Sequence, residues 1–359
     1  MNKLNVIVVF GGVSSEHPIS CISAASILRN IDKEKYTIYP VGITRDGAWR
    51  LIESEDFDSI EHDTWEQNDK SVPAVLSPDR KTHGLIVMRE TGTEVIHADC
   101  VFPVMHGIGG EDGTIQGLLE LAHIPYVGPG VAASACSMDK SLTKVVVEQE
   151  GVRQAAFYLA RKHAFEKDAD TECALVEEKL GSYPVFVKPC SEGSSVGVSK
   201  ATDRASLKAG LAEAFKYDAK VLVEEFIDGH EIEVAVLGND EPTATFAGEI
   251  APSQEFYTFE AKYVDGTSGL YIPAHISEKA MQTVREDAIR VYRALGCKGL
   301  SRVDFFCTYA DDEIVFNEIN TIPGFTSISM YPKLQEHMGL AYADLIDRLI
   351  SFAMERYDG

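Results

Sequence analysis

The first hundred residues alternate between continuous apolar runs and segments with helical spacing. Residues 4–10 form an apolar run that predicts a buried strand, and two glycines end it. Residues 20–28 have the spacing of an amphipathic helix, and residues 36–43 predict a second strand. A strand, a helix and a strand in this order are typical of a doubly wound α/β sheet. A further buried strand at 99–105 precedes the glycine-rich turn HGIGGEDG and the helical pattern TIQGLLELA.

The rest of the chain mixes single long helices with pairs of strands. Three segments have helical periodicity: 132–150, 278–295 and 340–355. Five segments read as strands: 184–189, 220–227, 229–238, 301–307 and 313–320. Residues 253–268 carry few aliphatic side chains and many aromatic and charged ones, which suggests a loop or lid. The pattern therefore predicts an α/β part followed by an α+β part, in about three subdomains.

Composition and charge exclude several classes of function. Of 359 residues, 56 are Asp or Glu and 33 are Lys or Arg, for a net charge of −23. Such a surface repels nucleic acid and anionic membranes, so we expect neither as a partner. The apolar run at the start is too short for a signal peptide, and no run approaches the roughly 20 residues of a membrane span. The seven cysteines are scattered, with no C-x-x-C pair, which predicts reduced thiols in a cytoplasmic protein.

Two short strand patterns near the end of the chain place oxygen-bearing side chains together. SRVDFF puts Arg302 and Asp304 on one strand face, and FNEINTIPGF does the same for Glu318 and Asn320. If the two strands pair, Asp304, Glu318 and Asn320 converge as an all-oxygen set that suits Mg²⁺ on nucleotide phosphates. The alternative is a pair of half-exposed strands whose outer faces are simply polar.

The segment KPCSEGSSVG, residues 188–197, contains glycines, serines and a lysine but is no Walker A loop. Its Lys188 precedes the glycines, whereas a Walker A lysine follows them. Lys140, in SMDKSLTK, is a second candidate for a phosphate contact. The alternative reading makes both lysines surface residues, with Gly193 and Gly197 marking an ordinary turn.

The segment VLVEEFIDGHE is a candidate for binding a purine ring. Glu224 follows an apolar strand, and Phe226 and Ile227 form an apolar pair directly after it. Backbone hydrogen bonds and apolar side chains at a strand end suit such a ring. A strand end followed by a turn, without a ligand, is the alternative.

Taken together, these segments resemble the ATP-grasp ligases, and the whole chain resembles the D-alanine–D-alanine ligase family. The matching segments occur in the family's order over about residues 6–335. They are FGGVSSEH, FPVMHGIGGEDGTIQG, SACSMDKSLTK, PVFVKPCSEGSSVGVSK, VLVEEFIDGHEIE, YTFEAKY, SRVDFF and NEINTIPGFTSISMYPKL. The resemblance implies an N-terminal Rossmann-like (pre-ATP-grasp) domain at 1–128. It also implies a central ATP-grasp subdomain at 129–228 and a C-terminal one at 229–359, with a lid loop near 253–270.

The resemblance implies ATP and two Mg²⁺ ions as cofactors, with Mn²⁺ as an alternative metal. Asp304, Glu318 and Asn320 match the family's metal ligands. The residues that match its ATP contacts are Lys140, Lys188, Gly193, Ser195, Glu224, Phe226, Ile227, Glu231 and Lys262.

The implied reaction joins two D-alanine molecules through a D-alanyl phosphate. Glu16 matches the residue that binds the first ammonium group, with Ser194 and Tyr263 as its hydrogen-bonded partners. Arg302 and the backbone N–H of Gly324 match the oxyanion hole. On the substrate side, His106, Ser329 and Met330 complete the predicted set.

The acceptor is less closely specified. Relatives that use D-lactate lack the lid tyrosine, whereas Tyr263 is present here, and Met330 stands where enzymes for D-lactate or D-serine commonly carry arginine. The sequence thus favours D-alanine, with D-serine or D-lactate as the alternative acceptor and a catalytically silent nucleotide-binding module as the alternative class. Pro18 and Glu225 depart from the family's usual residues. The resemblance further implies a homodimer formed through the N-terminal domain.

Overall fold

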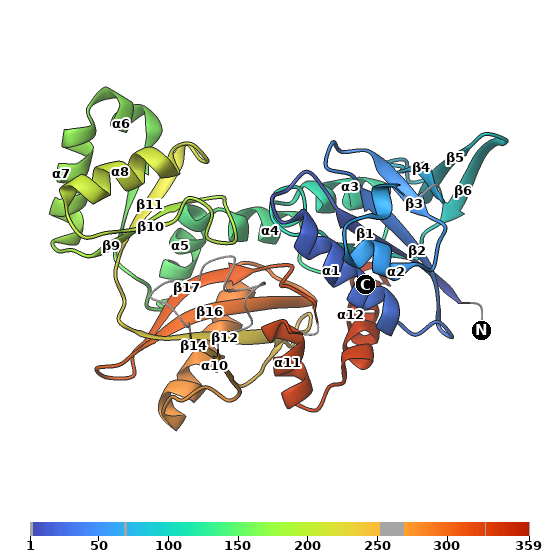
Figure 1. The fold of residues 1–359 in the computed structure, drawn as a ribbon. Coiled ribbons are helices and arrows are strands. Elements are labelled where there is room, and N and C mark those ends of the chain that lie inside the picture. The colour runs from blue at the N-terminus through green and yellow to red at the C-terminus, as the bar shows by residue number, and fades with distance from the viewer. Residues whose placement is uncertain (1–2, 68–69, 252–268, 327, 359) are drawn as a thin grey trace.

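The computed structural model describes residues 3–67, 70–251, 269–326 and 328–358, and its strands form three sheets. Figure 1 shows one sheet at the N-terminal end of the molecule and the other two at the opposite end. None of the helices in the described ranges is long and apolar enough to cross a membrane.

The first sheet has seven strands in the order β6-β5-β4-β3-β2-β1-β7. β1 pairs in parallel with β2 and β7, and the remaining pairs are antiparallel. The strands are β1 (Leu4–Gly11), β2 (Tyr36–Ile43), β3 (Trp49–Ile52), β4 (Ser71–Leu76), β5 (Gly84–Arg89), β6 (Gly92–His97) and β7 (Cys100–Val104). The accompanying helices are α1 (His17–Asn30), α2 (Phe57–Glu61), the 3₁₀ turn η1 (Trp65–Gln67) and α3 (Thr114–Ala122).

Two helices lead from the first sheet to the second. The sequence pattern predicted one helix over 132–150, but the structure has α4 (Val131–Met138) and α5 (Lys140–Gln149). The break falls at Asp139, whose backbone is extended and whose carboxylate accepts hydrogen bonds from the N–H groups of Ser141 and Leu142. This residue therefore caps α5 and starts it in a new direction.

The second sheet is antiparallel, in the order β10-β9-β11-β8. Its strands are β8 (Phe157–Arg161), β9 (Val185–Pro189), β10 (Ser199–Ala201) and β11 (Lys220–Glu225). The helices α6 (Lys162–Lys167), α7 (Ala169–Leu180) and α8 (Arg204–Ala214) accompany it, and a buried cluster that includes Val187, Leu207 and Val223 holds sheet and helices together.

The third sheet runs in the order β15-β14-β12-β16-β17, with β13 beside β12. Its strands are β12 (Gly229–Leu237), β13 (Thr243–Ala244), β14 (Gly248–Ala251), β15 (Gly269–Tyr271), β16 (Leu300–Thr308) and β17 (Ile314–Asn320). Apolar side chains of α10 (Glu278–Ala294) cover one face of it. The final helices are α11 (Met330–His337) and α12 (Tyr342–Asp358).

The last helix packs on the first sheet rather than on the sheet that precedes it in sequence. α12 contacts α1 and β7, as its place beneath the N-terminal strands in Figure 1 illustrates. One continuous apolar core thus contains Phe10 of β1, Leu237 of β12 and Leu349 of α12, together with Phe325 from the segment that precedes α11. This core ties the first and third sheets together and fixes the cleft between them.

Candidate functional site

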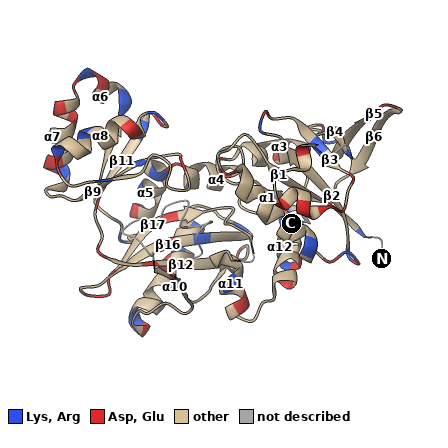
Figure 2. Ribbon diagram, in the orientation of Figure 1, with Lys and Arg blue, Asp and Glu red and all other residues tan. Residues whose placement is uncertain are grey.

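Half of the sequence-predicted site residues that the structure describes line one cleft, whose volume is about 750 Å³ including the part open to solvent. It is bounded by the start of α1, the loop after β7, the start of α5, the loop after β9, and the ends of β16 and β17. The predicted residues that line it are Glu16, His106, Lys140, Gly193, Ser194, Arg302, Glu318, Asn320 and Gly324. Figure 2 shows basic and acidic positions next to each other on β16 and β17.

The two strands predicted to carry the oxygen ligands do pair. In the antiparallel register of β16 and β17, Arg302 lies opposite Asn320, and Asp304 lies opposite Glu318. Arg302 donates to both carboxylate oxygens of Asp304, from Nε over 2.8 Å and from Nη2 over 2.7 Å. Asn320 Nδ2 donates to Oδ2 of the same carboxylate over 3.0 Å. The acidic, amide and guanidinium groups therefore form one connected set on one sheet face.

A second acidic group, Glu233, which the sequence analysis missed, also contacts Arg302. Glu233 Oε2 on β12 lies 3.0 Å from Arg302 Nε, and Glu233 lies opposite Asp304 in the β12–β16 register. Glu231 and Glu233 are two residues apart on β12, so their side chains lie on the same face of the strand. This spacing is the signal in the sequence that could have identified Glu233.

Lys140 and Lys188 approach the cleft from two different elements. Lys140 Nζ, at the start of α5, lies 3.6 Å from Glu318 Oε2 and donates to the carbonyl oxygen of Glu192 over 2.8 Å. Lys188 Nζ, on β9, lies 2.5 Å from Glu224 Oε2 and donates to Asn317 Oδ1 over 3.1 Å. The two ammonium groups thus face carboxylates of the third and second sheets.

Glu224 is buried between two lysines, one of which the sequence analysis missed. Lys144 on α5 is 1% exposed, and its Nζ lies 2.5 Å from Glu224 Oε1. Burial alone would raise the pKa of Glu224, but Lys188 and Lys144 lower it to about 2. The spacing of Lys140 and Lys144, four residues apart in SMDKSLTK, was the available signal, since it places both on one side of a helix.

The segment predicted to contact the adenine and ribose lies where β11 passes into β12. Phe226 follows β11, is partly exposed, and stacks on Phe186 of β9 with ring centroids 5.9 Å apart. Lys200 Nζ lies 4.8 Å above the Phe226 ring. Ile227 follows in the same connection, and Glu231 lies on β12 opposite Phe306.

Glu16 and Ser194 connect the first sheet to the loop after β9. Ser194 Oγ donates to Glu16 Oε1, although the two residues are 178 positions apart in the chain. Ser194 and Ser195 both have left-handed backbones, with φ of 48° and 62°. Tyr263, the third predicted member of this network, and Lys262, the predicted lid contact, lie outside the described residues.

His106 lines the cleft but uses both ring nitrogens within the protein. Its Nδ1 donates to the carbonyl oxygen of Ile322 over 2.9 Å, and its Nε2 accepts from Ser23 Oγ over 3.1 Å. This assignment requires a neutral ring, and burial lowers the pKa of His106 accordingly. The residue joins the loop after β7 to the segment after β17.

Glu111 is a further cleft residue that the sequence analysis missed. Its carboxyl oxygens accept hydrogen bonds from the N–H groups of Gly107, over 3.0 Å, and Ile322, over 3.2 Å. Burial, and then the nearby Glu16 carboxylate, raise the pKa of Glu111 to about 7. The turn HGIGGEDG contains it, but nothing in that pattern distinguishes this acid from its neighbour Asp112.

Of the residues predicted to meet the acceptor, Ser329 and Met330 point in different directions. Ser329 Oγ accepts from the N–H of Thr326 over 3.1 Å, and a Cβ on Gly324 would lie 3.0 Å from it. Met330 instead begins α11 in the apolar core, 5% exposed, with its sulfur against Gly248. The Met330 side chain therefore packs in the core in this structure, and the substrate contact expected of it stays a prediction.

Comparisons with known proteins agree over almost the whole chain. Residues 5–129 match the family model described as D-ala D-ala ligase N-terminus, and residues 146–351 match the one described as D-ala D-ala ligase C-terminus. A D-alanine–D-alanine ligase of Caldicellulosiruptor bescii is 49% identical, over 99% of this chain and 96% of the relative. Another, of Clostridium novyi, is 48% identical, over 99% of both chains.

Two solved structures share the fold. The VanG D-Ala:D-Ser ligase from Enterococcus faecalis superimposes with a TM-score of 0.88 at 38% identity, covering 98% of this chain and 100% of that one. The D-alanine-D-alanine ligase from Coxiella burnetii gives a TM-score of 0.85 at 35% identity, covering 99% and 96%.

Proposed function

Since the chain belongs to the D-alanine–D-alanine ligase family, an ADP-forming ligase family of peptidoglycan precursor synthesis, we propose that it joins two D-alanine molecules in the cleft described above. The observation that carries this proposal is the convergence of five side chains from three elements. They are Lys140 of α5 and Arg302, Asp304, Glu318 and Asn320 of the β16–β17 pair.

ATP-dependent ligation is common to the family, and we propose where the nucleotide lies. Lys140 and Lys188 would contact the phosphates, with Gly193, Ser195 and Lys262 closing over them. Glu224, Phe226, Ile227 and Glu231 would hold adenine and ribose. The stacked pair of Phe226 and Phe186 supports this placement, because an aromatic surface beside a strand end suits a purine ring.

The residues of the β16–β17 pair fit a divalent metal. Asp304, Glu318 and Asn320 offer only oxygen donors, the ligand type that Mg²⁺ and Mn²⁺ prefer. When bound, two such ions would neutralise charge between the nucleotide phosphates and the attacking carboxylate. Arg302 would then release part of its contact with Asp304 and offer donors to substrate oxygen.

The chain's own residues would carry the two steps in sequence. Glu16 would bind the ammonium of the first D-alanine, whose carboxylate attacks the γ-phosphate and gives D-alanyl phosphate and ADP. The second D-alanine's amine then attacks the acyl carbon, and phosphate leaves. Arg302 and the N–H of Gly324 would stabilise the oxyanion of that step, where one lost donor costs about 10² to 10³ in rate. Ser194, with Tyr263, would hold Glu16 and exclude water from the acyl phosphate.

A phosphate-release assay with ATP, Mg²⁺ and D-alanine tests the proposal. We expect D-alanine-dependent release and a D-alanyl-D-alanine product. Ser194→Ala should slow it, because Glu16 loses its partner across the cleft, whereas Ser206→Ala, in an exposed capping box of α8, should not. Wild-type protein that releases no phosphate under these conditions would contradict the proposal.

D-serine is the second candidate for the acceptor. The VanG D-Ala:D-Ser ligase is a structural neighbour, and Met330, whose identity favoured D-alanine in the sequence, is buried in the core and is absent from the cleft lining. We propose D-alanine as the main acceptor and Ser329 as the residue that meets its carboxylate. Competition between D-alanine and D-serine or D-lactate in one reaction, with products separated by mass, decides this: a dominant mixed product would overturn the assignment.

We further propose the division 1–128, 129–228 and 229–359, a homodimer formed through the first unit, and a cytoplasmic location. The three sheets support the division, with the qualification that α12 packs on the first sheet. The scattered free cysteines support a reducing compartment.

A further inference from the structure

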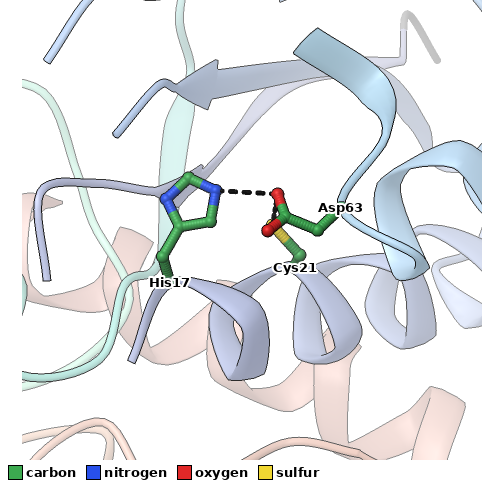
Figure 3. Close-up of side chains that lie close together, drawn as sticks. All are labelled: His17, Cys21 and Asp63. Carbon is green, nitrogen blue, oxygen red and sulfur yellow. Dashed lines mark hydrogen bonds and ion pairs between the residues drawn. The ribbon is translucent and has the colours of Figure 1, made fainter. Parts of the chain in front are cut away.

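His17, the last residue of the motif FGGVSSEH, has both ring nitrogens against oxygen acceptors. Nδ1 lies 2.7 Å from the carbonyl oxygen of Gly12, and Nε2 lies 3.0 Å from Oδ1 of Asp63, as Figure 3 illustrates for the carboxylate. A neutral imidazole has one N–H and would turn a lone pair toward one of these oxygens. The arrangement therefore needs a second proton, shared between the ring and the facing carboxyl group, or a metal ion between them; Arg45, which donates to Oδ2 of Asp63, favours an ionised carboxylate and hence a proton on the ring.

The surroundings of the ring favour the proton. His17, Cys21 and Asp63 lie close enough together to hold a metal, and the first two are fully buried. However, Arg45 Nη2 already donates to Oδ2 of Asp63 and compensates its charge. Burial, and then Asp63, raise the pKa of the Cys21 thiol, so this sulfur keeps its proton and is a poor ligand.

The other groups near the His17 ring do not change the preference for a proton over a metal ion. Trp65 lies parallel to the imidazole, with centroids 6.4 Å apart and an interplanar angle of 8°. Glu66 accepts from the backbone N–H of Arg45 over 3.2 Å, one step further from the ring. Within the described part of the chain, Asp63 is the charged group in direct contact with the His17 ring, and Arg45 contacts the other oxygen of that carboxylate.

We propose that His17, held as an imidazolium between Gly12 and Asp63, is a positioning residue that sets the place of Glu16 for the first substrate's ammonium. Glu16 directly precedes His17 as the N-cap of α1, and its carboxylate lines the cleft. The inference rests on the proposed function for what Glu16 binds, but the protonation of His17 does not depend on it.

The bonds of the first turn of α1 explain how His17 acts on its neighbour. His17 fixes the carbonyl of Gly12, whose φ is +102°, and the N–H of Gly11 donates to Ser20 Oγ over 2.7 Å. Both ends of this turn are therefore tied to the two-glycine turn after β1. Asp63, from the segment after α2, holds the ring from the opposite side.

Glu16 has little room to move, so a shift of α1 would be felt in the cleft. A Cβ on Gly107 would lie 2.5 Å from Glu16 Oε2, and one on Gly193 would lie 2.8 Å from it. The carboxylate is thus enclosed by two backbone segments that belong to different sheets. Small displacements of its own backbone would change its distance to a bound ammonium.

The first experiment compares kinetics of three variants. His17→Leu removes both bonds, and we expect the KM for the first D-alanine to rise about tenfold to a hundredfold, the range for lost hydrogen bonds to charged groups. The KM for ATP should change less than the KM for D-alanine, since His17 contacts Gly12 and Asp63, neither of which is proposed to bind the nucleotide. His17→Asn, whose amide nitrogen can replace Nδ1, should recover most of the loss. Asp58→Asn, an exposed acid on α2, is the control and should match the wild type.

The second experiment tests protonation directly. Nitrogen-15 spectra of the histidine rings should show two N–H groups on His17 in the wild type and one in Asp63→Asn, where the new amide donates to Nε2. A single N–H in the wild type would overturn the proposal. So would a thiolate absorption band at one Cd²⁺ per chain that disappears in Cys21→Ser, since the metal would then replace the proton.

The outcomes separate the two proposals. A folded His17→Leu variant with an unchanged KM for D-alanine would overturn the positioning role. Should His17→Leu not fold, a raised KM in His17→Gln, which cannot reach Gly12 and Asp63 at once, supports the role, and an unchanged KM overturns it. Wild-type protein without D-alanine-dependent phosphate release would refute the proposed function, and the ring spectra would still decide the state of His17.

Discussion

Lys144 shows how a residue outside the predicted set can determine the state of one inside it. Glu224 is 4% exposed, and two ammonium groups at 2.5 Å balance its charge. If Lys188 contacts a nucleotide phosphate, part of its contact with Glu224 is given up. Lys144 would then be the cation that keeps Glu224 ionised at this buried position.

We predict that Lys144→Met destabilises the fold and weakens ATP binding. Removing one partner of a buried ion pair typically costs about 3 to 5 kcal/mol, and the remaining Lys188 should hold the loss at the lower end. The free energy of unfolding from urea titration and the KM for ATP measure both effects. Lys208→Met removes an exposed ion pair with Asp170 and should change neither by a comparable amount. Equal effects of the two substitutions would contradict the role of Lys144.

The raised pKa of Glu111 predicts that the free energy of unfolding falls as the pH rises, which is the opposite of the usual dependence for a carboxyl group. Its pKa in the folded chain, about 7, is above its ordinary value of 4.5, so the folded state binds more protons between these values. The stabilisation of the folded state by this protonated carboxyl group is therefore fully present below pH 4.5 and is lost as the pH rises through 7. The full change is at most about 3 kcal/mol.

The measurement is the free energy of unfolding at pH 5, 6, 7 and 8 for the wild type and Glu111→Gln. We expect the wild type to lose stability relative to the variant over this range, because glutamine does not titrate. Glu148→Gln, at an exposed position on α5, controls for a general effect of removing an acid. A constant difference between wild type and Glu111→Gln would show that the carboxyl does not titrate there.

Sequence reasoning located side chains wherever a regular period fixed their direction. The period of two along a strand placed Arg302, Asp304, Glu318 and Asn320 on one face, and the pairing of β16 with β17 is confirmed. No such period in the sequence reveals which residue a charged side chain will contact. Glu111, Lys144 and Glu233 depend on contacts between segments far apart in the chain, and their neighbours in sequence look the same.

At the scale of elements, the break between α4 and α5 is the main difference from the expected helix. Both segments have helical spacing, so their periodicity runs on across Asp139. What ends the helix is the side chain of Asp139, which bonds the first N–H groups of α5 and pairs with Lys220 of β11. The strands β3 to β6 were not predicted, because their short, partly exposed segments alternate weakly.

We predict that Asp139→Ala affects both stability and nucleotide affinity. Loss of an N-cap typically costs about 1 to 2 kcal/mol, and α5 carries Lys140 and Lys144. Their placement should become less defined, which raises the KM for ATP. Asp168→Ala removes the equivalent cap of α7, which carries no predicted site residue, so stability should fall without a change in KM. A matching rise in KM for both variants would contradict the local explanation.

At the scale of the whole molecule, the predicted fold class of an N-terminal Rossmann-like domain followed by an ATP-grasp fold is confirmed by the comparisons with solved structures. The return of α12 to the first sheet was not foreseen. Helical periodicity tells which face of a helix is apolar but not which sheet covers it. In the structure, Tyr36 donates to Asp347 over 2.6 Å, and Leu345 and Leu349 join the core of the first sheet.

Arg356 provides the test of that return, because it fastens α12 at the point where the first sheet passes into α4. Its Nη1 donates to the carbonyl oxygen of Gly128 over 2.6 Å, and its guanidinium lies 4.6 Å from the ring centroid of Tyr126. Gly128 has φ of +103°, a backbone conformation that glycine adopts readily, and its carbonyl oxygen is thereby available to the Arg356 guanidinium.

We expect Arg356→Met to lower the free energy of unfolding by about 2 kcal/mol, since it removes a charged hydrogen bond and a cation–π contact. The loss should be accompanied by a lower kcat, because the first and third sheets enclose the cleft together. Arg348→Met, at an exposed position on the same helix and near Phe352, should cost much less. Urea unfolding and steady-state kinetics measure the two effects. Equal losses for both arginines would contradict this role of Arg356. They would mean that α12 stabilises the fold through its apolar face alone, and that the junction at Gly128 keeps its conformation without the Arg356 hydrogen bond.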